Sequence, residues 1–291
     1  MRYIFIWTLL WAVYEAESQL STKPYSSLFS ETGYPYLGDI PLLNRKVFRG
    51  SRVTIREHPY IVSVRRNFVH YLTGSLLTKN VVLSVAHPLY RVPIDELAVV
   101  SGENYSDRGT IVLTVVLLII HKQFDPYTLR ADLALIRFYE DIVVRSKLSI
   151  DSRSSTKTIE LVSPTTAIFG TRAFVTGWGR CDFTGKELCL PRSSLYRPDE
   201  RSDPMLRTIS FVITERNVHC DVYNQHSNPL VPGQLCTGVA REMDVLTPCM
   251  AVPGAPLVVW GKLAGVLSWG LGCGYANDLP LIYSDVQYYG S

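Results

Sequence analysis

Short runs of β-branched and aromatic residues recur along most of the chain, separated by glycine, proline and asparagine. Short runs bounded by turn-forming residues are typical of β-strands. No internal repeat at a fixed period accompanies them. The sequence therefore predicts an all-β protein, built as a sandwich or as barrels, with little helix. The most apolar run, "IVLTVVLLII" at 111–120, is interpreted as a buried strand.

The first residues have the pattern of a secretory signal peptide. A basic start at Arg2 is followed by an apolar run from Ile4 to Tyr14 and then by small residues. A membrane anchor is the alternative, but the run is well short of the roughly 20 residues that span a bilayer. We expect residues 1–18 to be the signal peptide and the mature protein to be secreted and extracellular. We therefore expect no membrane partner.

The segment 19–46 is rich in serine, proline and tyrosine and has no convincing periodicity. Composition of this kind is typical of an exposed propeptide or linker. The net charge of the whole chain is only +3, so we expect no nucleic-acid partner. Basic residues do cluster early, which we interpret as a solvated basic face, with a site for anionic polysaccharide as the alternative. The cluster comprises Arg45, Lys46, Arg49, Arg52, Arg56, Arg65 and Arg66.

Six cysteines in a secreted chain indicate three disulfides, because the extracellular compartment is oxidising. Sequence alone permits fifteen connectivities. None of the cysteines has the C-x-x-C spacing of a zinc site, and we expect neither a metal nor a cofactor. The six are Cys181, Cys189, Cys220, Cys236, Cys249 and Cys273.

Two residues are candidates for chemistry. His87 follows the strand-like "VVLSVA", and Asp132 opens the apolar "LALIRF". An aspartate at the start of so apolar a run is expected to be buried at least in part, and a buried carboxylate needs a partner. Either residue alone is more often structural than catalytic.

Together with their surroundings, these residues resemble the trypsin-like serine protease family. "TGSLLTKNVVLSVAHP" is similar to the family's first barrel with its T-A-A-H-C motif, and "DLALIRF" to its D-I-A-L-L-K-L. "VTGWGR", "LCTG", "GAPLVV", "VLSWGLGCG" and "PLIYSDV" follow in family order. The resemblance implies that residues 47–291 form a peptidase S1 domain of two packed six-stranded antiparallel β-barrels, with the C-terminal helix truncated. It places His87 at the general-base position and Asp132 at the carboxylate that orients it.

The nucleophile position departs from the family. Its motif C-x-G-D-S-G-G-P-L-V aligns with Cys249 and "PLV" without a gap, which puts Pro253 where the serine stands. Proline has no hydroxyl, and it also lacks the backbone N–H that would be one oxyanion-hole donor. The other oxyanion-hole position is Ala251, a glycine in the family. Val252 replaces the aspartate that receives the new N-terminus after activation.

The specificity pocket also departs from the family. Thr247 stands where trypsin has aspartate, so no charge would receive a basic side chain. Leu281 replaces a glycine, and we expect its side chain to fill most of the pocket. The same resemblance assigns Ser268 and Gly270 to the pocket walls.

These departures imply a secreted, non-catalytic serine protease homologue that binds an extracellular protein. An active enzyme with a displaced nucleophile is the alternative, but no Ser or Thr lies between Cys249 and Leu257. We expect His87 to remain as the structural partner of Asp132, because an unpaired buried carboxylate is costly. Asn104 opens an Asn-Tyr-Ser glycosylation pattern.

The resemblance supports pairing Cys220 with Cys236 and Cys249 with Cys273. The two remaining cysteines, Cys181 and Cys189, are close enough in sequence to staple a short loop. That loop continues into a long charged segment, and we expect partner binding there.

Overall fold

The computed structural model describes nine stretches of the chain: 51–109, 111–140, 156–178, 205–215, 220–221, 223, 229–238, 253–270 and 280–290. The predicted signal peptide and propeptide lie outside them. So do the predicted positions Thr247, Ala251, Cys181, Cys189, Cys249 and Cys273, as well as Arg45, Lys46 and Arg49.

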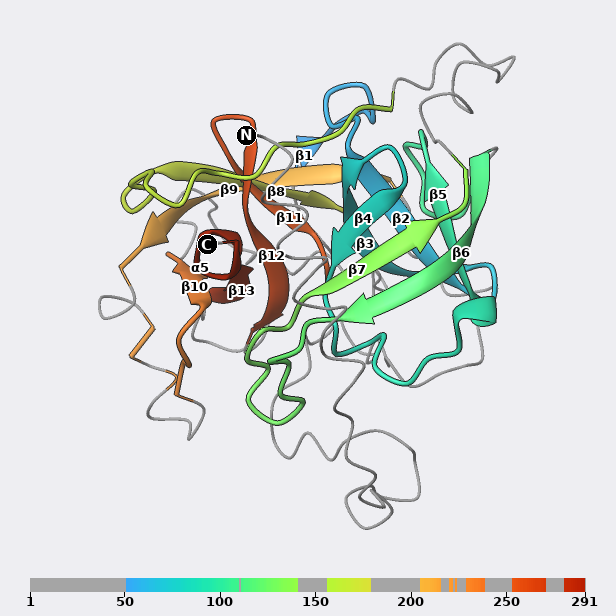
Figure 1. Cartoon of the computed structure of the whole chain (residues 1–291). Helices are drawn as coiled ribbons and strands as arrows, with labels where there is room; N and C mark the ends of the chain where they lie inside the picture. Colours follow the sequence, from blue (N-terminus) through green and yellow to red (C-terminus); the bar gives the residue numbers. More distant parts are fainter. Residues whose placement is uncertain are drawn as a thin grey trace, which may run out of the picture.

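The first half of the domain is a closed antiparallel barrel, with strands in the order β2-β3-β4-β7-β6-β5 (Figure 1). Alternate residues point inward, as period-2 strands require. The inward set forms one apolar cluster that includes Val62, Leu72, Val99, Leu113 and Ile136. The strands are β2 (Ile61–Arg66), β3 (Val69–Thr78), β4 (Val81–Ser84), β5 (Leu97–Ser101), β6 (Ile111–Ile120) and β7 (Ala134–Phe138).

The second half is another antiparallel barrel, which closes because β8 pairs with both β9 and β11. Its order is β8-β9-β10-β13-β12-β11, and β1 (Ser51–Arg52) adds to β9. The strands are β8 (Arg172–Gly177), β9 (Arg207–Thr214), β10 (Gln234–Thr237), β11 (Pro256–Val259), β12 (Lys262–Gly270) and β13 (Leu281–Asp285). The prediction of two six-stranded antiparallel barrels is confirmed.

Helix is scarce in the described residues. They hold the 3-10 turn η2 (Ile94–Glu96) and α5 (Val286–Tyr289), a single turn that follows β13. Asp285 caps α5, its carboxylate accepting hydrogen bonds from the backbone N–H groups of Gln287 and Tyr288. Neither helix is long enough to cross a membrane.

The interpretation of 111–120 as a buried strand is half wrong. The strand is β6, but only its inward residues Ile111, Leu113 and Val115 are buried. Val112 and Leu117 face outward and are 46% and 40% exposed. Antiparallel barrels commonly leave one face of a strand in water, so a run of apolar residues did not reveal which side was covered.

The interpretation of the early basic cluster as a solvated face is wrong for one of its residues. Arg65 is buried, and its guanidinium donates hydrogen bonds to the backbone carbonyls of Ser106 and Arg108. Arg66 is half-buried and pairs with Glu96 at 2.6 Å. These two arginines therefore hold local structure, and only part of the early cluster faces solvent.

The barrels meet through an apolar cluster to which both contribute. Leu83 and Val85 come from the first barrel, and Val258, Val266 and Val286 come from the second. A backbone hydrogen bond also crosses the contact, from the N–H of Thr73 to the carbonyl of Pro253 at 3.0 Å.

Gly254 lies at this contact, directly after Pro253. Its φ is +89°, and a Cβ there would lie 1.9 Å from the backbone oxygen of Thr73. We expect Gly254→Ala to lower the free energy of unfolding by about 3 kcal/mol or more, because backbone strain and a clash with a carbonyl add together. Urea denaturation measures the loss.

Gly170 is the matched control. Its φ is +74°, but nothing lies within 4 Å of an added Cβ. Gly170→Ala should cost only the backbone strain, about 1–2 kcal/mol. Equal losses in the two variants would show that the barrels do not press together at Gly254.

Candidate functional site

Asp132 lies at the centre of the candidate site and is fully buried. It stands two residues before β7, in a loop where Leu129 and Ala131 both have positive φ, of 53° and 51°. Positive φ costs a residue with a side chain roughly 1–2 kcal/mol. The backbone therefore accepts local strain next to this carboxylate, and the surrounding contacts must offset it.

The carboxylate of Asp132 accepts four hydrogen bonds. The backbone N–H groups of Ala86 and His87 donate to Oδ1 at 2.8 and 2.7 Å. His87 Nδ1 lies 2.7 Å from Oδ2, and Ser268 Oγ donates to the same oxygen at 2.5 Å. The expected partnership between Asp132 and His87 is present, and the carboxylate is paired as a buried charge must be.

The balance of effects lowers the pKa of the Asp132 carboxyl below its ordinary value. Burial on its own raises this pKa, but the nearby His87 and the hydrogen bonds from His87 and Ser268 outweigh it. An ionised carboxylate can only accept hydrogen bonds, so Nδ1 of His87 carries a proton. This arrangement leaves Nε2 as the ring atom that could accept a proton from a neighbouring group.

The second barrel also holds Asp132. Ser268 lies on β12, and Ser284 on β13 donates from its Oγ to the backbone oxygen of Asp132 at 3.0 Å. Sequence reasoning placed Ser268 only among the pocket walls and missed Ser284. Both serines interrupt apolar strands, at "VLSW" and "LIYSD". A polar residue inside an apolar strand was the sequence signal that could have indicated a buried hydrogen-bonding role.

Pro253 lies in the turn that precedes β11, and its carbonyl accepts the hydrogen bond from Thr73. The backbone of this turn is therefore anchored to the first barrel, and the N–H of Gly254 donates to the carbonyl of Leu267 at 2.9 Å. Proline has neither a hydroxyl nor an N–H. The site thus combines a proton acceptor and its orienting carboxylate with a side chain at 253 that cannot attack a carbonyl.

Leu281 begins β13 opposite Gly270 on β12. Its side chain is buried in the apolar cluster of the second barrel, together with Leu267 and Tyr283. That it fills a specificity pocket stays a prediction, because Thr247 and its neighbours lie outside the described residues.

Cys220 and Cys236 form a disulfide, as the resemblance implied, with their Cα atoms 6.5 Å apart. The other two pairings lie outside the described residues. Asn104 is half-buried, and its Oδ1 accepts a hydrogen bond from the N–H of Ile55 at 2.6 Å. Its glycosylation stays a prediction.

The buried pair should be a measurable source of stability. Asp132→Asn removes the charge but keeps the size, and we expect a loss of about 3 kcal/mol or more at pH 7, because the amide cannot accept from all four donors. Since the native pKa is lowered, the contribution of Asp132 is present above its unfolded-state pKa, and it disappears as pH falls through the native one. Urea denaturation at pH 7 and in acid should therefore show a weaker acid dependence in the variant.

Asp125→Asn is the control for that experiment. Asp125 is half-buried, and its carboxylate accepts hydrogen bonds from the N–H of exposed Tyr127 and the hydroxyl of exposed Thr128. We expect a change within about 1 kcal/mol. Similar losses in the two variants would refute a special role for the buried pair.

Comparisons with known proteins agree with this geometry. The family model described as Trypsin matches residues 47–291. Trypsin alpha-4 of Lucilia cuprina is 28% identical over 251 residues, which are 86% of each chain. Hypodermin-B of Hypoderma lineatum is 29% identical over 252 residues, 86% of this chain and 87% of its own.

Among solved structures, the chain is similar to an inactivated protease paralogue of the scabies mite. The TM-score is 0.65 at 22% identity, over 84% of this chain and 94% of that one. This likeness is one of fold. Because the family model covers most of the chain, the protein belongs to the trypsin family.

Proposed function

We propose that this trypsin-family chain is a secreted, non-catalytic homologue that acts by binding an extracellular protein. The observation that carries the proposal is Pro253, which stands in the anchored turn where the family has its nucleophile. Loss of the nucleophilic serine lowers kcat by a factor on the order of 10⁶ in a well-studied serine protease. The same residue also removes an oxyanion-hole donor.

A displaced nucleophile finds no support in the described part of this region. Ser84 is fully buried, and its hydroxyl donates to the backbone oxygen of Thr73 at 2.6 Å. Ser268 is also buried and donates to Asp132. Each hydroxyl is engaged in holding the fold and is closed to a substrate carbonyl.

The comparisons are compatible with this proposal. The sequence relatives named above are a trypsin and a hypodermin, whereas the structural neighbour is named an inactivated protease paralogue. The name of that neighbour describes a protein of this fold that has lost protease activity. Secretion rests on the N-terminal pattern, and the disulfide is compatible with an oxidising compartment.

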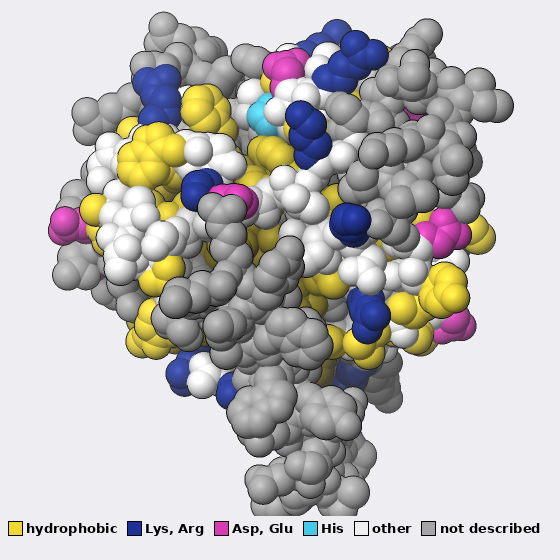
Figure 2. All heavy atoms as spheres, turned by 45° about the horizontal axis from the view of Figure 1, so that its top comes forward, with side chains coloured by type: hydrophobic (Ala, Val, Ile, Leu, Met, Phe, Trp, Pro, Cys, Tyr) yellow, Lys and Arg dark blue, Asp and Glu magenta, His cyan; other side chains and the backbone are white. Residues whose placement is uncertain are grey.

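A protein partner is favoured over an anionic polysaccharide. Two arginines of the early cluster, Arg65 and Arg66, are engaged within the protein. On the face shown in Figure 2, the Lys and Arg side chains of the described residues are scattered among hydrophobic ones and do not gather into one continuous patch. Weak dependence of partner binding on salt would fit this choice, since contacts among exposed charges are screened.

The first test is direct labelling. The purified chain, whether or not it is cleaved before Val47, should neither hydrolyse peptide substrates nor react with a fluorophosphonate, because residue 253 has no hydroxyl. In-gel fluorescence beside an active trypsin provides the comparison. Labelling that His87→Ala abolishes would establish an active enzyme and overturn the proposal.

Repair is the second test. Pro253→Ser alone should give no measurable turnover, because the oxyanion hole and pocket have changed as well. Restoring the family residues together, with Ala251→Gly, Val252→Asp, Pro253→Ser and Leu281→Gly, should give detectable hydrolysis. Robust turnover from the single change would mean that proline at 253 is the only defect.

A further inference from the structure

The loop that leads into the buried carboxylate is fixed by hydrogen bonds to its backbone. The N–H of Asp125 donates to the carbonyl of Arg130 at 3.0 Å, and the N–H of Leu133 donates to the carbonyl of Ala131 at 2.7 Å. Between these two carbonyls in the chain lies the N–H of Ala131, a buried residue, and this N–H donates to the phenolic oxygen of Tyr289 at 2.9 Å. The peptide planes on both sides of Ala131 are therefore held in place.

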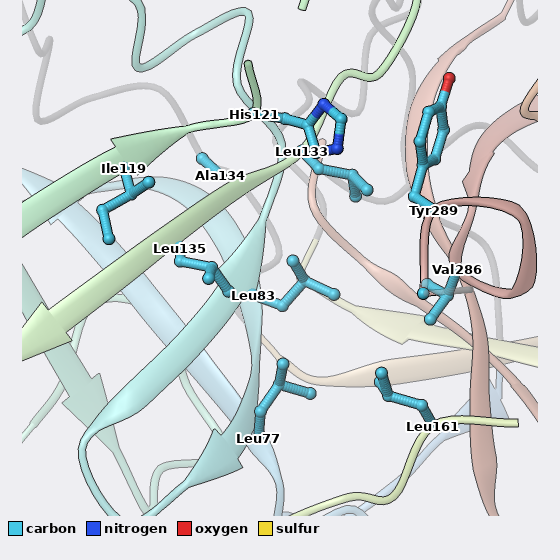
Figure 3. A pocket seen from close by; sticks show the side chains of 11 residues that line it. Leu77, Leu83, Ile119, His121, Leu133, Ala134, Leu135, Leu161, Val286 and Tyr289 are labelled. Atoms are coloured by element: carbon cyan, nitrogen blue, oxygen red, sulfur yellow. The ribbon is translucent and has the colours of Figure 1, made fainter. Parts of the chain in front are cut away.

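Tyr289 reaches this loop from α5, the helical turn that follows β13 in the second barrel. Figure 3 shows its ring beside that of His121, and the two ring centroids lie 5.1 Å apart. The phenolic O–H in turn donates to the carbonyl of Pro232 at 3.3 Å. Burial raises the pKa of Tyr289, so the hydroxyl keeps its proton and acts as a donor and an acceptor at once.

Close packing fixes the place of this hydroxyl. Gly233 has a φ of +84°, and a Cβ at this position would collide with the phenol of Tyr289. The N–H of Asp285, at the end of β13, donates to the carbonyl of Gly233 at 2.9 Å. The side-chain amide of Gln287 in α5 donates to the carbonyl of Thr166 at 2.9 Å. The hydroxyl is therefore a fixed point against which the loop is held.

The loop carries backbone strain that its contacts must offset. Leu129 and Ala131 both have positive φ, a conformation that residues with a side chain disfavour. A strained segment persists only while the surrounding contacts hold it. The side-chain amide of Gln234 holds the first half of the loop, donating to the carbonyls of Thr128 and Leu129 at 3.3 Å each. The hydroxyl of Tyr289 holds the second half at Ala131.

Asp132 follows Ala131 directly, so the conformation at Ala131 decides where its carboxylate lies. Oδ1 accepts from the N–H groups of Ala86 and His87, and Oδ2 lies against the ring of His87. Ser284 holds the carbonyl of Asp132, on the far side of its Cα, and the near side is held through Ala131. Hydrogen bonds weaken steeply as their angles depart from linear. A change at Ala131 therefore loosens the bonds to Ala86 and His87 together.

We propose that the Tyr289 hydroxyl is a positioning group for the pair of His87 and Asp132. By holding Ala131, it keeps the carboxylate where it meets its donors, and so it sets the orientation of the His87 ring. A helical turn of the second barrel thereby controls a histidine of the first. This control needs neither a binding partner nor a nucleophile at position 253, so it stands apart from the proposed function.

The test is amide hydrogen exchange of the full, isotope-labelled chain, followed by NMR. Tyr289→Phe keeps the ring and removes only the hydroxyl. We expect the amide of Ala131 to exchange faster, because its buried N–H loses its acceptor. The amides of Ala86 and His87, whose acceptor is Asp132, should also exchange about tenfold faster, because the carboxylate is no longer held in place.

The proton on Nδ1 of His87 gives a second signature. It lies in a short, charge-assisted hydrogen bond to Asp132, and a proton in such a bond resonates far downfield. In Tyr289→Phe we expect this resonance to move upfield and to exchange with water about tenfold faster. A residue that only stabilised the fold would leave the position of the resonance unchanged.

Tyr288→Phe is the matched control. Tyr288 is the neighbouring residue of α5, is 47% exposed, and likewise loses only a hydroxyl. The exchange rates at Ala86 and His87 should stay within about twofold of the parent's in this variant. The slowest amides of β2 and β5 report global unfolding, and in Tyr289→Phe they should accelerate less than those of Ala86 and His87.

Should Tyr289→Phe fail to fold, the parent chain decides. Its amides at Ala86, His87 and Ala131 should then show one common dependence of exchange on denaturant, because they open together. Four results would overturn the proposal: acceleration confined to Ala131, equal acceleration of every amide, the same acceleration in Tyr288→Phe, or separate opening of Ala131 and His87 in the parent. Fluorophosphonate labelling would sink the proposed function and leave these exchange rates as they are.

Discussion

A single buried negative charge governs how this molecule is assembled. Asp132 is removed entirely from water, and an uncompensated carboxylate there would cost several kcal/mol. Its partners come from both halves of the domain: Ala86 and His87 follow β4 in the first barrel, and Ser268 lies on β12 in the second. The charge is satisfied only when the two barrels sit in one relative position.

Under the proposed function, this dependence accounts for a catalytic geometry that remains without catalysis. Removing the His87 side chain would strip one of the four hydrogen bonds from a buried charge, whereas a proline at 253 leaves the hydrogen bonds of its turn in place. The turn at Pro253 keeps its structural contact through its carbonyl, which any residue possesses. The stability of the fold therefore depends on the pair of Asp132 and His87 and does not require a hydroxyl at position 253.

The sequence predicted those features of the fold and the site that depend on residues close together in the chain. Strand-like runs indicated the barrels, and an aspartate opening an apolar run indicated a buried carboxylate in need of a partner. The serines that complete its shell were not predicted. Ser284 lies 152 residues from Asp132 in the chain, and only the closure of the second barrel brings the two together.

The predictions of burial were wrong where the same residue type occurs both in buried and in exposed positions. Arg65 stands in a run of basic residues and looks solvated, yet its guanidinium fills a place among backbone carbonyls of the 106–108 loop. The outward residues of β6 looked buried because they are apolar, yet Val112 is 46% exposed. In both cases the burial of the side chain depends on which neighbouring segment covers it, and the composition of the strand does not predict that.

Tyr289 connects the buried charge to a small apolar pocket beside α5 (Figure 3). Its ring lines the pocket beside His121, and its hydroxyl accepts a hydrogen bond from the N–H of Ala131 at 2.9 Å, one residue before Asp132. The same contacts hold α5 against the loop that carries Asp132, so the buried charge and this end of the contact between the barrels depend on one arrangement.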